Sequence, residues 1–187
     1  MTVIKKQEPV FQVRSFDDEE FQRFNSNVFE SAIVTREMFE EWENTLDSIE
    51  LKLDADPTVN LSSFYEKLQL AQEKRNEIIT ILTKALSYKA MWDSYVSVAE
   101  KYVRKLKSEL SQLEEVRILK NKELQESKMY SKRSDVFDCL SYCSSISDWV
   151  DTMVKVFDMK LNLIDQANLN INRQITVTEM LTYKGLL

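Results

Sequence analysis

Apolar residues recur at alternating steps of three and four through the middle of the chain, from Leu61 to Leu113. Only Arg75 and Lys89 interrupt this stripe. Its apolar members are Leu61, Phe64, Leu68, Ala71, Ile78, Leu82, Ala85, Trp92, Val96, Ala99, Val103, Leu106, Leu110 and Leu113. A hydrophobic repeat of about 3.5 residues keeps one side of a helix against a neighbouring helix. The pattern predicts a central helix over about 62–129 that packs lengthwise on other helices.

Two further stripes flank the central one. The first runs from Phe21 to Leu53 and is followed by a turn at 54–57, where Pro57 disfavours helix in the residue before it. The second runs from Val136 to Ile164 and follows the polar cluster 131–134, with Ser134 as the expected helix cap. Three long helices are therefore expected, the first packing on the front half of the central helix and the last on its rear half.

The scarcity of turn residues favours a few long helices over a sheet. Glycine occurs once, at Gly185, and proline twice, at Pro9 and Pro57. The predicted fold is all-α, a long antiparallel coiled coil or helical bundle over 17–175. A short arm over 1–16 and a tail over 176–187 flank it, and the β-branched run 175–178 is expected to be extended. A chain reversal near Ser87, giving a four-helix bundle, is the alternative.

The sequence contains little that is typical of an enzyme. It has no histidine, and its one glycine rules out a glycine-rich phosphate loop. Cys139 and Cys143 supply half of a zinc site at most, and the glutamates at 37, 40, 41 and 43 lack a calcium loop. We expect no catalytic residue, no metal and no cofactor.

The cellular setting follows from what the chain lacks. No run approaches the roughly 18 apolar residues of a membrane span, and the N-terminus has no signal-peptide core. The two cysteines lie one helical turn apart, where a disulfide is strained. A soluble protein of the reducing cytoplasm is expected.

Charge is distributed unevenly around a total of −6. Residues 1–60 hold 6 basic and 14 acidic side chains, whereas residues 88–133 hold 11 basic and 7 acidic ones. Basic side chains on the predicted helix over 101–133 are candidates for phosphate contacts with single-stranded nucleic acid. They are Lys101, Arg104, Lys105, Lys107, Arg117, Lys120, Lys132 and Arg133. Anionic lipid is a weaker alternative, since the chain is acidic overall.

The leading functional hypothesis is a non-enzymatic scaffold, assembly or adaptor protein that associates with itself or with another helical protein. Apolar faces that one chain leaves uncovered are expected to be buried by other copies. The expected anchors of this interface are Phe39, Trp42, Leu106, Leu110, Leu113, Trp149 and Phe157. The competing hypothesis is an oligomeric nucleic-acid accessory protein, of the loader or recombination-mediator type, that uses the basic helix.

Overall fold

The structure is a computed structural model that describes residues 16–49 and 61–185. Within these ranges every element is a helix, so the predicted all-α helical bundle is confirmed. The helices are α1 (Asp18–Asp47), α2 (Leu61–Leu110), α3 (Glu114–Arg117), α4 (Lys122–Lys132) and α5 (Ser134–Tyr183).

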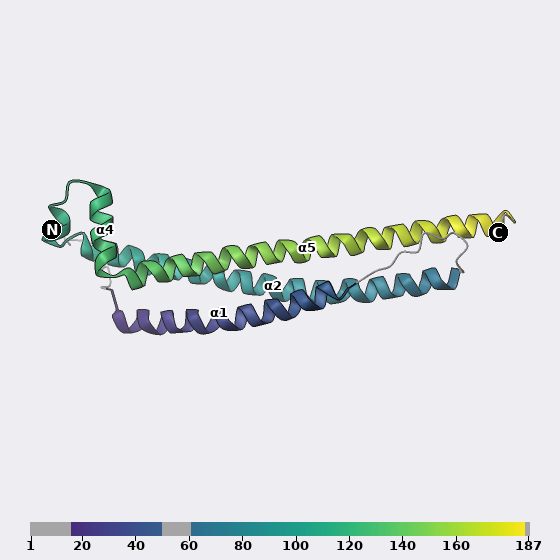
Figure 1. Ribbon diagram of the computed structural model, residues 1–187, viewed down its shortest axis with the longest axis horizontal. Coiled ribbons are helices and arrows are strands. Elements are labelled where there is room, and N and C mark those ends of the chain that lie inside the picture. Colours follow the sequence, from purple (N-terminus) through teal and green to yellow (C-terminus); the bar gives the residue numbers. More distant parts are fainter. Residues whose placement is uncertain (1–15, 50–60, 186–187) are drawn as a thin grey trace, which may run out of the picture.

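The two longest helices, α2 and α5, lie side by side and antiparallel (Figure 1). Each has 50 residues and is therefore about 75 Å long. The first helix, α1, packs along one half of this pair, and α3 and α4 close the end at which α2 turns into α5 (Figure 1). Over the described residues the molecule is a rod with three long helices side by side in one half and two in the other.

Helix α1 begins one turn before its apolar stripe. Asp17 is the N-cap, and its carboxylate accepts a hydrogen bond from the Glu20 amide at 3.0 Å. Seven members of the stripe are buried: Phe21, Val28, Ala32, Thr35, Phe39, Trp42 and Leu46. The turn expected at 54–57 lies outside the described residues, as does most of the N-terminal arm.

Helix α2 passes through Ser87 without a break, so the alternative reversal there is wrong. The Ser87 hydroxyl bonds back to the Thr83 carbonyl at 3.2 Å, inside the helix. The expected end near residue 129 is also wrong, because α2 stops at Leu110. The amides of Gln112 and Leu113 bond three residues back, and the backbone of Leu113 is extended. The chain then folds over so that Val116 and Met129 are buried.

Helix α5 is longer than its apolar stripe predicted. The run 175–178, expected to be extended, is helical, and the helix ends only at Tyr183. Packing explains the difference, because Ile171 and Ile175 are buried with Phe64 and Ala71 of α2. Gly185, with a φ of +64°, follows the C-cap of this helix and tolerates the left-handed backbone.

The position of α1 along the rod also corrects the prediction. The start of α1 lies at the end of α2, where the Phe21 and Tyr102 rings are 5.4 Å apart. The end of α1 reaches only the middle of α2, where Leu46 and Ile78 line a shared cavity of about 210 Å³. Helix α1 thus packs on the rear half of α2, and α5 packs on α2 along nearly its whole length.

The reason for this placement is a row of tyrosines on the rear half of α2. Tyr88, Tyr95 and Tyr102 recur every seven residues, and each contacts an aromatic ring of α1. A row of aromatic residues next to the apolar stripe widens the buried surface of α2, so that α2 can pack on a second helix in addition to α5. This spacing is visible in the sequence and points to the half of α2 that α1 covers.

Candidate interaction surfaces

Four of the predicted anchors meet in one aromatic cluster inside the chain. Phe39 of α1 lies 5.0 Å from Trp42, 5.3 Å from Trp149 and 5.7 Å from Phe157, measured between ring centroids. Phe39, Trp42 and Phe157 are buried, and Trp149 is partly buried. These residues therefore hold α1 against α5 within a single chain, and Tyr88 of α2 contacts the same cluster. Their role in contacting another protein stays a prediction.

The other three anchors lie near the turn between α2 and the short helices. Leu106 is buried and Leu110 is partly buried against the same core. Leu113, just beyond the end of α2, keeps 39% of its surface exposed. Of these three, Leu113 is the most accessible to a partner.

A buried polar link joins α1 to α2 next to the aromatic cluster. The Trp92 indole Nε1 donates to Thr35 Oγ1 at 3.0 Å, and Thr35 Oγ1 donates to the Ser31 carbonyl at 2.6 Å. Both Trp92 and Thr35 are fully buried. The sequence placed both residues on apolar stripes but contained no signal that they pair, because their contact depends on the register of two separate helices.

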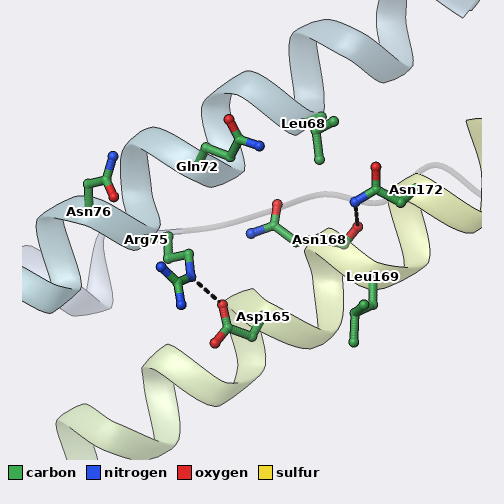
Figure 2. Close-up of a pocket in the computed structure, with 8 residues that line it drawn as sticks. All are labelled: Leu68, Gln72, Arg75, Asn76, Asp165, Asn168, Leu169 and Asn172. Atoms are coloured by element: carbon green, nitrogen blue, oxygen red, sulfur yellow. Dashed lines mark hydrogen bonds and ion pairs between the residues drawn. The ribbon is translucent and has the colours of Figure 1, made fainter.

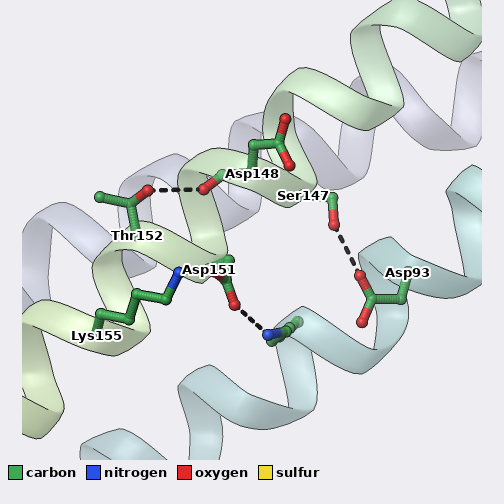
Figure 3. Close-up of polar contacts among 7 residues, drawn as sticks. Asp93, Ser147, Asp148, Asp151, Thr152 and Lys155 are labelled. Carbon is green, nitrogen blue, oxygen red and sulfur yellow. Dashed lines mark hydrogen bonds and ion pairs between the residues drawn. The ribbon is translucent and has the colours of Figure 1, made fainter.

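The two charged residues that interrupt the stripe of α2 each meet an aspartate of α5. Arg75 Nε donates to Asp165 Oδ1 at 2.6 Å, and Lys89 Nζ pairs with Asp151 (Figures 2 and 3). Arg75 and Lys89 are two heptads apart, and so are Asp151 and Asp165. One antiparallel register therefore satisfies both pairs, and polar residues at such positions are known to select register.

The Asp151 carboxylate is the most strongly perturbed acid on this surface. It accepts hydrogen bonds from Lys155, at 2.5 Å, and from Lys89, and these contacts lower the pKa of Asp151 to about 2. The hydrogen bond to Asp151 also raises the pKa of Lys89 above its usual value, and the charge of Asp93 acts in the same direction. Asp93 extends this polar region by accepting a hydrogen bond from Ser147 Oγ at 2.8 Å (Figure 3).

This arrangement predicts how stability responds to acid. A carboxyl whose pKa falls on folding stabilises the folded state above its unfolded pKa, near 4, and loses that effect as the pH drops toward 2. We expect Asp151→Asn to lower the melting temperature at pH 6, and the difference from wild type to shrink between pH 4 and pH 2. Circular dichroism melts across this range measure both chains. Asp148→Asn, at an exposed neighbouring position, is the control, and a difference that does not change with pH would contradict the prediction.

A polar groove lies between α2 and α5 in the two-helix half of the rod. It has a volume of about 580 Å³ and is lined by Leu68, Gln72, Arg75, Asn76, Asp165, Asn168, Leu169 and Asn172 (Figure 2). The Asn168 Oδ1 atom is buried there and has no hydrogen-bond partner among the described residues. An unpaired buried oxygen is costly, so this groove favours an incoming donor.

The candidate phosphate contacts are spread over the end of the rod, and most are already engaged. Four make ion pairs: Arg104 with Glu100 (3.4 Å), Lys107 with Glu126 (3.1 Å), Lys132 with Glu115, and Arg133 with both Asp18 (2.7 Å) and Asp135 (3.1 Å). Lys105 lies over the Tyr102 ring at 5.8 Å. Only Lys101, Arg117 and Lys120 lack an ion pair or ring contact within the described ranges. The contacts of Lys107, Lys132 and Arg133 depend on the fold of residues 111–133, whereas those of Arg104 and Lys105 lie within α2.

The two cysteines and the four glutamates of α1, which are the candidate metal ligands in the sequence, lie apart in the described structure. Cys139 and Cys143 are buried free thiols, and their mutual hydrogen bond together with burial raises the pKa of Cys143. The glutamates at 37, 40, 41 and 43 are exposed on α1. In the described parts of the chain, no group of three or more histidine, cysteine, aspartate or glutamate side chains is placed to hold a metal ion.

Two further observations bear on the class of protein. None of the described helices combines the length and the apolar character that crossing a membrane requires. Comparisons of the chain with protein-family models, curated proteins and solved structures found no match.

Proposed function

We propose that this protein is a non-enzymatic helical scaffold or adaptor that associates with itself, with another helical protein, or with both. The observation that carries this proposal is the exposure of large apolar side chains on all three long helices. Examples are Ile33 on α1, Leu86 on α2, and Met159, Leu163 and Leu169 on α5. Met159 and Leu163 are one helical turn apart on α5, and contiguous exposed apolar surface is typical of sites of protein association.

The shape of the molecule supports the same proposal. A rod built on two helices of about 75 Å offers long faces to a neighbouring helix and few concave surfaces to a small molecule. Helices recognise one another through apolar residues spaced three and four apart, which is the spacing that this chain uses for its own core. The absence of histidine from the sequence also argues against acid–base catalysis.

Sedimentation velocity of the purified chain tests the proposal. We expect a species larger than one 22.0 kDa chain to form as the concentration rises from about 1 to about 100 μM, the range in which micromolar affinities are resolved. A single-chain mass at every concentration, with no helical partner recovered, would contradict it.

Binding of single-stranded nucleic acid receives less support. Most of the basic residues proposed for it are held by carboxylates or by a ring, which leaves Lys101, Arg117 and Lys120 to attract phosphates. An oligonucleotide that binds at about 50 mM salt and dissociates at about 200 mM would favour this alternative.

A further inference from the structure

Helix α1 covers only one side of the α2/α5 pair. On α2 this side carries Tyr88 and Tyr95, whose rings contact Phe39 and Phe24 of α1. On α5 it carries Trp149, which contacts Phe39. These aromatic contacts show on which side of the α2/α5 pair helix α1 lies.

The polar contacts between α2 and α5 lie on the other side. Asp93 is two positions from Tyr95, and Asp151 is two positions from Trp149, so each aspartate lies about 200° around its helix from the aromatic residue. Asp93 bonds Ser147 and Asp151 pairs with Lys89 across the two helices (Figure 3). No helix among the described residues covers this side.

We call this uncovered side the open face and define it by two sets of residues. Its polar members are Arg75, Lys89, Asp93, Ser147, Asp151 and Asp165. Its apolar members share the same stripes at three-, four- or seven-residue spacing. They are Leu86 and Leu169, which are exposed, and Leu82, Val154 and Leu161, which also pack partly against the chain's own core. Leu86 is 49% exposed and Leu169 is 57% exposed, so the open face is not sealed by the chain's own core.

The charges of the open face identify what covers it. Cations (Arg75, Lys89) and anions (Asp93, Asp151, Asp165) share the same face. A nucleic acid requires a uniformly positive surface, which the aspartates preclude. A second copy in a two-fold arrangement presents the same mixture of cations and anions, so that cations of one copy can face anions of the other.

The available area is also sufficient. A strip about 75 Å long and one helix diameter, about 10 Å, in width provides roughly 750 Å² on each copy. Stable protein interfaces bury about 800 Å² on each partner. We infer that two copies of this chain pack with their open faces together, with α2 and α5 of both copies forming a four-helix core and the two α1 helices on the outside. This inference rests on the proposed self-association and identifies its surface.

The test compares two variants of the full chain by sedimentation equilibrium. The first, Leu86→Lys with Leu169→Lys, places two cations on the open face at positions that a single chain leaves exposed. We expect its dimer dissociation constant to rise at least about 100-fold, which corresponds to about tenfold for each leucine replaced. The second variant, Ile33→Lys, changes an equally exposed residue on the outer side of α1, and we expect it to dimerise as the wild type does. Circular dichroism melts at low protein concentration check that both variants stay folded.

The outcomes separate the inference from the proposed function. Dimers that persist in the open-face variant, or that disappear in Ile33→Lys alone, would overturn the inference and leave self-association standing. A wild-type chain that never associates would overturn both. Association that appears only when single-stranded DNA is added would overturn the open-face dimer in favour of a nucleic-acid assembly.

Discussion

Replacing Phe39 by alanine should lower the free energy of unfolding by about 3–5 kcal/mol, the largest effect we expect from a single substitution. Phe39 is fully buried, and its ring contacts rings from all three long helices: Trp42 in α1, Tyr88 in α2, and Trp149 and Phe157 in α5. Removing it leaves a cavity that none of the three helices can fill alone. Urea denaturation followed by circular dichroism measures the change.

Phe29→Ala is the matched control for this prediction. Phe29 is also on α1 and also contacts an aromatic ring of α5, that of Tyr142 at 5.0 Å, but about half of its surface is exposed. We expect its replacement to cost about 1 kcal/mol, because little surface leaves water on folding. Equal effects of the two substitutions would show that the aromatic cluster does not hold the helices together.

Replacing Thr35 by valine should lower the free energy of unfolding by about 1–3 kcal/mol, although the two side chains have nearly the same shape. The change removes the oxygen that accepts the Trp92 Nε1 hydrogen bond at 3.0 Å. The indole nitrogen is then left buried without a partner, and burial of an unpaired donor carries the full cost of removing it from water. Urea denaturation again gives the difference.

Thr80→Val provides the comparison. Thr80 lies on α2, is exposed, and bonds only the Asn76 carbonyl of its own helix, at 2.9 Å. Its substitution should change stability by no more than about 0.5 kcal/mol. If Thr35→Val is equally neutral, the buried link between α1 and α2 contributes no net stability.

The charged residues that interrupt the stripe of α2 were predictable from the sequence, whereas their ion-pair partners were not. Arg75 and Lys89 are recognisable as exceptions from their spacing alone. Their partners, Asp165 and Asp151, lie on a helix that begins beyond the turn, and no local signal connects them. The structure identifies the partners because antiparallel pairing sets the register of the two helices.

The apolar stripes also did not predict where the helices end. The sequence stripe continued past Leu110, yet α2 ends there because burying Val116 and Met129 at the end of the rod outweighs continuing an exposed helix. Asn121, whose side chain caps α4 through the Glu123 amide at 2.8 Å, was a readable local signal of the new helix. At the other end, the β-branched residues 175–178 are helical because α2 supplies a packing surface.

By itself the sequence determined that this protein is all-α and that its long helices lie along apolar stripes, whereas it left open a reversal near Ser87 that the structure excludes. These features depend on the period of hydrophobic residues and on the lack of glycine and proline, which act locally. Only the tertiary structure decided which half of α2 is covered by α1, which aspartates pair with the stripe's cations, and which face is left open. Those features depend on contacts between residues far apart in the chain, where the burial of whole side chains outweighs local preference.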